Sequence, residues 1–271
     1  MESVKLIESW PVDNAATAVV GADGAVAASH GDQQRRFPLA SVTKLLSAYA
    51  VLLAVEEGAL ELDQPAGPEG STVRHLLAHS AGYDFGDRTV RFSPGDRRLY
   101  SNAGFEVLGE TLEAAAGMAF ADYLREGVLV PLGMKDTSLD GSPAAGATST
   151  SADLSRFAAE LQRPSLLAAA TVQEATQVAY PGLAGVLPGF GRQQGNDWGL
   201  GFEIRGHKEP HWTGSKSSPK TFGHFGQSGT FLWVDPDAGP ACIALTDRDF
   251  GPWAADAWPA YTDAVLTELG R

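Results

Sequence analysis

One long apolar segment most constrains the fold of this chain. The residues "FPLASVTKLLSAYAVLLAV", from Phe37 to Val55, predict a helix from Ser41 to Val55, and Gly58 follows as a left-handed C′ residue. The segment is apolar on every side of this helix except for a single cation, Lys44. Because a helix that is apolar all round must be surrounded by protein, we expect this one at the centre of a domain.

The rest of the sequence changes its periodicity along the chain. Residues 17–29 predict a β-hairpin, because Asp23 and Gly24 supply a tight turn between two apolar segments. Thr150 and Asp153 form a capping box at the start of a later helix. The further predicted helices cover 72–82, 102–117, 119–134 with a break before Pro131, and 150–162. A strand is predicted over 198–204, and successive strands over 222–248 with a turn at 235–239. A closing helix covers 255–270 and is interrupted near its start by Pro259.

This order of elements predicts an α+β fold, in which an antiparallel sheet is flanked by helices and shared by the two ends of the chain. We expect a single catalytic domain over residues 1–271. Residues 1–60 and 195–271 would form its α/β subdomain, and residues 61–194 a mostly helical insertion. Active sites favour the seam between two such parts.

Composition excludes several classes of partner. The formal net charge of −13 argues against nucleic acid and anionic membranes as partners. No stretch approaches 18 apolar residues, and Met1–Asn14 has no signal-peptide pattern, so we expect a cytoplasmic protein without a membrane span. Cys242 is the one cysteine, which rules out a disulfide framework and indicates a buried packing role. The sequence carries no indication of an oligomeric state.

The spacing of Ser41 and Lys44 indicates nucleophilic chemistry. Residues at i and i+3 of a helix lie on one face, so the lysine amine can reach the serine hydroxyl. A serine hydroxyl becomes a useful nucleophile when a neighbour takes its proton. Burial lowers the pKa of a lysine and makes it able to act as that base. The alternative without a catalytic role is that Lys44 extends its charged amine to the surface.

Two further pairs have a spacing that suits a site. Tyr100 and Asn102 can project together where an extended segment enters a helix, although Asn102 could simply cap that helix. His224 and Gly226 lie two apart on a predicted strand and therefore face the same side. The glycine would allow a ligand to approach the main chain closely, although a lone histidine in a hairpin often has no task.

The three motifs together, S-x-x-K, Y-x-N and H-x-G in this order, resemble the serine β-lactamase and penicillin-binding protein superfamily. The Y-x-N form looks like the branch that holds class C β-lactamases, DD-carboxypeptidases and esterases. The resemblance covers most of the chain, including the segments "HLLAHSAG" (75–82), "FSPGDRRLYSNAGFEVLGETLEAAAG" (92–117), "PLGMKDTSL" (131–139) and "WGLGFEI" (198–204).

The resemblance implies a role for each motif residue. Ser41 would be the acylated nucleophile and Lys44 its base, while Tyr100 would share proton transfer and Asn102 would orient the acyl group. Two backbone N–H groups, those of Ser41 and Gln227, would form an oxyanion hole, in which one donor stabilises a transition state by about 2.7–4 kcal/mol.

The strand motif departs from the pattern of many relatives. His224 stands where they carry a lysine, and a histidine is mostly neutral at pH 7, which suits a substrate carboxylate less well. Lys220-Thr221-Phe222 is a rival alignment, but it lacks a glycine in third place, so we prefer His224 and Gly226.

We therefore expect a serine hydrolase without a cofactor or metal, acting on a small-molecule ester or amide. The missing signal peptide and His224 favour an esterase over a β-lactamase or a D-Ala-D-Ala peptidase. The alternative is a ligand-binding or regulatory module with little turnover. An α/β-hydrolase lacks support because "GQSGT" ends in Thr230, and a zinc peptidase because Leu76 replaces the glutamate between His75 and His79.

Overall fold

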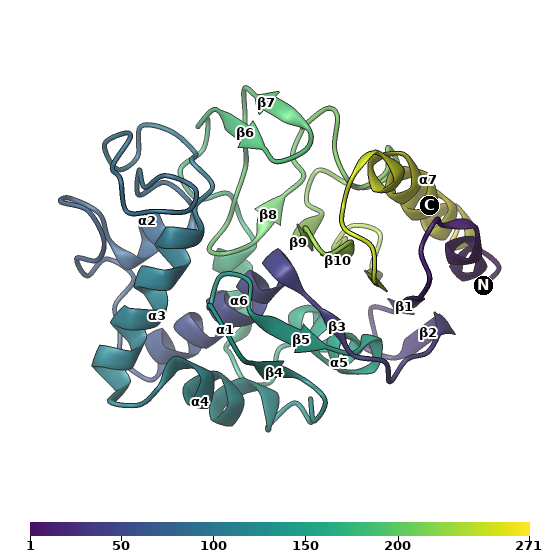
Figure 1. Cartoon of the computed structure of the whole chain (residues 1–271), viewed down its shortest axis with the longest axis horizontal. Coiled ribbons are helices and arrows are strands. Elements are labelled where there is room, and N and C mark those ends of the chain that lie inside the picture. Colours follow the sequence, from purple (N-terminus) through teal and green to yellow (C-terminus); the bar gives the residue numbers. More distant parts are fainter.

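A six-stranded antiparallel sheet forms the centre of the computed structural model, which describes residues 1–271 (Figure 1). Val19 of β1 pairs with Cys242 of β11, so the two ends of the chain share one sheet, as predicted. The strand order is β2-β1-β11-β10-β9-β8, with bounds β1 (Ala15–Val20), β2 (Val26–Gly31), β8 (Glu203–Ile204), β9 (Phe222–Gly226), β10 (Thr230–Val234) and β11 (Ala241–Thr246).

Helices cover both faces of this sheet. On β1, Ala16 and Ala18 belong to the core shared with α1 (Thr43–Glu56) and α5 (Ser151–Gln162). Val19 faces the opposite way, into the core beneath η1 (Ser3–Ser9) and α7 (Pro252–Glu268). Because successive residues of a strand face opposite sides, β1 contributes side chains to both cores. The termini lie side by side at this second layer (Figure 1), where the backbone N–H of Glu2 donates to Glu268, 2.7 Å away.

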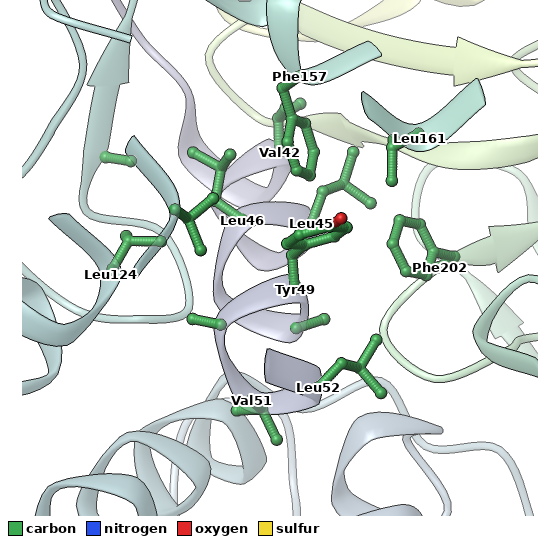
Figure 2. Packing of buried hydrophobic residues seen from close by; sticks show 14 of the residues in the cluster. Val42, Leu45, Leu46, Tyr49, Val51, Leu52, Leu124, Phe157, Leu161 and Phe202 are labelled. Carbon is green, nitrogen blue, oxygen red and sulfur yellow. The ribbon is translucent and has the colours of Figure 1, made fainter. Parts of the chain in front are cut away.

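The apolar segment forms the central helix that the sequence predicts. In Figure 2, Leu46 of α1 points toward Leu124, while Tyr49 lies near Phe202 and Phe157. The Tyr49 hydroxyl donates to Oε1 of Glu160, 2.6 Å away, which satisfies the one polar atom of that ring. The helix begins two residues later than expected, because a short 3-10 turn, η2 (Ala40–Val42), holds Ser41.

In Figure 1, α2 (Val73–Leu77) and α3 (Asn102–Ala116) lie on the side of α1 away from α7, while β6 (Gly185–Leu187) and β7 (Gly191–Gln193) lie at the top of the view. The side chain of Thr150 accepts from the backbone N–H of Asp153 at 3.1 Å, so the predicted cap of α5 is confirmed. The other elements are α4 (Phe120–Leu124), η3 (Arg125–Leu129), α6 (Ala169–Ala175), β3 (Phe37–Pro38), β4 (Ser138–Leu139) and β5 (Ala147–Ser149).

Several predicted elements differ from the structure. The helix predicted over 72–82 ends at Leu77, because the backbone turns to a left-handed conformation at His79, with φ of 52°. Only Glu203–Ile204 of the predicted strand 198–204 joins the sheet. Pro259 lies inside α7 without ending it, since a proline removes one backbone donor while apolar packing on the sheet holds both halves of the helix.

The α+β fold with a helix-flanked antiparallel sheet is confirmed. The subdomain boundaries near residues 60 and 195 stay predictions. None of the helices combines the length and apolar character needed to cross a lipid bilayer.

Candidate active site

Lys44 is enclosed completely and lies next to Ser41. Its Nζ atom is 3.4 Å from Oγ of Ser41, 2.6 Å from Oδ1 of Asn102 and 2.8 Å from the carbonyl oxygen of Ala144. The side chain has 0% exposure, so it does not extend its head to solvent. The alternative interpretation, that Lys44 extends its charged amine to the surface, is therefore wrong.

Burial lowers the pKa of Lys44 well below its usual value of 10.5, although the charge of Glu106 opposes the shift. An uncharged amine has two hydrogens and one lone pair. The oxygens of Asn102 and Ala144 can accept the two hydrogens, which leaves the lone pair for the hydroxyl of Ser41. The arrangement can take a proton from that hydroxyl.

Tyr100 completes a chain of polar groups. Its hydroxyl lies 2.7 Å from Oγ of Ser41, and burial raises its pKa, so the phenol keeps its proton. The side chain of Ser101, and not that of Asn102, caps α3 by accepting from the backbone N–H of Gly104 at 3.1 Å. The interpretation of Asn102 as a helix cap is wrong, and its amide is free to contact Lys44.

His224 lies on β9 behind this group. Its side chain is buried, with Nδ1 2.6 Å from the carbonyl oxygen of Phe225 and no hydrogen-bond partner at Nε2. Burial, helped by the charge of Lys44, lowers the pKa of His224 to about 3. The rings of Tyr100 and Trp198 pack against it, with centroids 5.6 and 5.2 Å away. His224 is therefore an uncharged ring within the site.

Gly226 allows β9 to approach the turn that carries the serine. A Cβ atom at this position would lie 2.3 Å from the carbonyl oxygen of Leu39. We expected the glycine to admit a ligand, but the group that comes close is the chain's own backbone. Thr230 holds the same carbonyl through Oγ1 at 3.0 Å, and Ala40 adopts a φ of 43° just before the serine.

Gln227 follows Gly226 at the same edge of the site. Its carbonyl accepts from the backbone N–H of Phe250 at 2.7 Å, and its side chain donates to the Phe250 carbonyl at 3.1 Å. These two bonds fix the peptide, while its own N–H is not used within the protein. Such an N–H can donate to an oxyanion.

A small cavity of about 90 Å³ opens at Ser41. Its walls are mainly aromatic and aliphatic, with few polar groups, as is typical of small-molecule sites. The larger surface hollow of about 710 Å³, between β2 and α5, contains none of the sequence motifs. The residues that line the small cavity are Ser41, Phe85, Tyr100, Leu187, Pro188, Trp198, Glu203, His224, Phe225 and Gln227.

The rival motif residue lies elsewhere. Lys220 is 70% exposed and pairs with Asp237, with 2.8 Å between Nζ and Oδ1. Of the two alignments, the structure brings His224 to the cavity and leaves Lys220 at the surface. Nowhere do three or more His, Cys, Asp or Glu side chains gather as a metal site would require.

Ala144 and His79 are among the contributors to this site that sequence reasoning missed. Ala144 offers only its carbonyl oxygen, and no side-chain pattern reveals such a role. His79 packs on the ring of Tyr100, with centroids 4.5 Å apart, and its Nδ1 accepts from the backbone N–H of Ser101 at 3.2 Å. Its place within the segment "HLLAHSAG" was the available signal.

A family model described as β-lactamase matches residues 12–266, and the chain belongs to this family of serine hydrolases. A β-lactamase from Mycobacterium bovis has a solved structure with a TM-score of 0.97 and 56% identity, covering 98% of this chain and 99% of that one. The resemblance inferred from the three motifs is confirmed.

Curated relatives match smaller parts of the chain. Penicillin-binding protein 4* of Bacillus subtilis (strain 168) is 29% identical over 134 residues, covering 37% of this chain and 30% of that protein. Esterase EstB of Burkholderia gladioli is 33% identical over 147 residues, covering 37% of each protein. The matched part is thus well under half the length of these relatives.

Proposed function

We propose that this protein hydrolyses a small ester or amide through an acyl-enzyme formed on Ser41, and that esters are its better substrates. The observation that carries the proposal is the contact chain from the Tyr100 hydroxyl to Oγ of Ser41, at 2.7 Å, and on to the buried amine of Lys44, at 3.4 Å. A hydroxyl held between a phenol and an uncharged amine can lose its proton as it attacks.

In the first half-reaction, Oγ of Ser41 bonds to the acyl carbon and its proton passes to Nζ of Lys44. The backbone N–H groups of Ser41 and Gln227 stabilise the oxyanion, and Asn102 orients the acyl group beside the lysine. The bond from the acyl carbon to the leaving group then breaks. Tyr100 gives its proton to the departing atom and recovers a proton from Lys44, so a neutral alcohol or amine leaves.

The second half-reaction reverses these transfers with water. Water attacks the acyl carbon and loses a proton to the same Tyr100 and Lys44 pair. The bond from the acyl carbon to Oγ of Ser41 breaks, the serine regains its proton, and a carboxylic acid departs. One pair of groups serves both steps, because each step needs a base first and an acid afterwards.

Labelling with an activated phosphonate tests the proposal. We expect intact mass spectrometry to show one phosphonyl group on the wild-type protein and none on Ser41→Ala. Ser217→Ala removes the serine of Ser217-Ser218-Pro219-Lys220, a second S-x-x-K sequence with a proline inside it, and should label like the wild type. A wild-type protein that stays unlabelled would favour the alternative, a ligand-binding or regulatory module with little turnover.

The neutral ring of His224 supports the preference for esters over β-lactams and D-Ala-D-Ala peptides. It offers no permanent cation for the carboxylate that those two substrate classes carry. A panel of p-nitrophenyl acyl esters, nitrocefin and D-Ala-D-Ala peptides should give its highest kcat/KM with a short acyl ester. The name of the Mycobacterium bovis relative makes β-lactam hydrolysis the second candidate, and efficient nitrocefin turnover would favour it. The cytoplasmic location stays a prediction.

A further inference from the structure

The Nε2 atom of His224 is a buried hydrogen-bond acceptor without a partner, on a ring that lines the cavity. Nδ1 lies 2.6 Å from the carbonyl oxygen of Phe225, and a carbonyl can only accept, so Nδ1 carries the ring proton. Nε2 of the neutral ring then presents a lone pair. That atom has no partner, although the side chain is only 4% exposed and lines the cavity next to Ser41.

The carboxylate of Glu203, which lines the same cavity, already accepts hydrogen bonds from three side chains. Glu203 accepts from Lys208 Nζ, from Trp212 Nε1 at 2.9 Å and from His211 Nε2 at 3.1 Å. These donors hold Glu203 ionised and occupied, so it competes weakly for a ligand. His224 is thus the buried polar side chain at the cavity whose acceptor remains unpaired.

Burial is the main reason that the ring of His224 stays uncharged, and a charge on Lys44 acts in the same direction. The ionised Glu203, on the neighbouring strand, opposes this effect but does not outweigh it. Tyr100 adds a protonated phenol, and its ring packs at 5.6 Å. An unpaired buried acceptor costs free energy, and a ligand that donates to it recovers that cost.

We propose that Nε2 of His224 binds an uncharged hydrogen-bond donor of the substrate, a hydroxyl or an amide N–H, and that it rejects a carboxylate at this position. A carboxylate has only lone pairs, so it would face the lone pair of Nε2 without a proton between them. The inference rests on the proposed function, since it assigns a substrate group to the hydrolytic site at Ser41. The small volume of the cavity requires the donor to sit on a short arm of the substrate.

Two matched series of esters test the inference. The first consists of phenyl acetates with a meta hydroxymethyl, methoxymethyl or carboxylate group, which places the arm on the leaving group. The second consists of p-nitrophenyl propanoates with a 3-hydroxy, 3-methoxy or 3-carboxylate group, which places it on the acyl side. Within each series the hydroxyl and its methyl ether differ in one donor and share nearly the same electronic effect.

For the wild-type protein we expect at least one series to show kcat/KM higher for the hydroxyl than for the methyl ether by about tenfold, with the carboxylate lowest. His224→Phe keeps a ring of similar shape without Nε2, so its hydroxyl-to-ether ratio should fall to about one. The ratio compares two substrates within one variant and does not depend on that variant's total activity. His207→Phe, in an exposed loop, should keep the wild-type ratio.

A ratio near one for wild type in both series, or a preference for the carboxylate, would overturn the inference. Loss of phosphonate labelling at Ser41 would instead refute the proposed hydrolase. If His224→Phe does not fold, the ring nitrogens of the wild-type protein supply an independent test by ¹⁵N NMR. At pH 7 we expect an Nδ1–H, Nε2-unprotonated ring, and an Nε2–H tautomer or a charged ring would contradict the inference.

Discussion

The amine of Lys44 lies 2.6 Å from Oδ1 of Asn102, across 58 residues of sequence. This contact joins the start of α1 to the first residue of α3. Together with the carbonyl of Ala144, it positions the lysine beside Ser41. The position of the amine therefore depends on two helices and a loop that fold together.

Replacing Lys44 should abolish the proposed acylation. Lys44→Met keeps the length of the side chain and removes the base, so we expect the rate of acylation by a p-nitrophenyl ester to fall by about 10²–10⁴. Stopped-flow release of nitrophenolate measures that rate. Lys220→Met, at the exposed lysine of the rival alignment, should leave this rate unchanged, and substantial acylation of Lys44→Met would rule out Lys44 as the base.

Activity should rise with pH as Lys44 loses its proton, at a pH below the usual lysine value of 10.5. His224, with its pKa lowered to about 3, is neutral above pH 5 and should add no limb to the profile. Profiles of kcat/KM between pH 5 and 10 measure this dependence. A limb that disappears in His224→Phe would contradict the prediction.

The free energy of unfolding should also depend on pH because of the lowered pKa of Lys44. Between the lowered pKa of Lys44 and 10.5, the unfolded chain binds a proton at this residue and the folded chain does not. The free energy of unfolding contributed by Lys44 should therefore increase with pH in that window and stay flat below it. Urea titrations at several pH values measure it, and Lys44→Met should lack the slope. An identical slope in both proteins would show that the amine is charged in the fold.

Tyr100→Phe should slow both half-reactions. The variant keeps the ring that packs on His224 and removes the hydroxyl 2.7 Å from Ser41, so proton transfer loses its relay. We expect kcat/KM for a short ester to fall by about a hundredfold. Tyr123→Phe removes a hydroxyl that contacts Glu57, far from the motifs, and should keep full activity. Equal activities of the two variants would remove Tyr100 from the mechanism.

His79 should act as a positioning residue. His79→Phe keeps a ring against Tyr100 but leaves the buried N–H of Ser101 without an acceptor, at a cost of about 1–3 kcal/mol in unfolding free energy. Since Ser101 lies between Tyr100 and Asn102 in the chain, we expect kcat to fall more than KM rises. His75→Phe, on the half-buried face of the same segment, supplies the control. A His79→Phe protein with lower stability and unchanged kcat would leave His79 a purely structural role.

Gly226→Ala should destabilise the fold at the junction of β9 and the serine turn. The new Cβ would lie 2.3 Å from the Leu39 carbonyl, a backbone atom that cannot rotate away. We expect a loss of about 1–3 kcal/mol in unfolding free energy by urea titration, with lower activity. Gly195 has open space around its Cβ position, so Gly195→Ala is the matched control and should remain near wild type. Equal stability of the two variants would refute the close approach.

Local sequence patterns correctly predicted those helices that depend on neighbouring residues in the chain. The apolar segment around Lys44 predicted a central helix, and the cap at Thr150 predicted the start of α5. Patterns failed where long-range contacts compete with propensity. The apolar alternation over 198–204 yields only Glu203–Ile204 as a strand, because the adjacent residues turn back, with Trp198 bridged to Glu203.

By itself the sequence determined the family, the α+β architecture and the closeness of Ser41 and Lys44, since a spacing of three residues brings two side chains together over one helical turn. Only the tertiary structure decided that Lys44 is enclosed by Asn102 and Ala144 and that His224, not Lys220, reaches the cavity. The physical reason is that burial and hydrogen-bond partners come from residues distant in the chain, and these set the charge of a side chain more strongly than its sequence neighbours do.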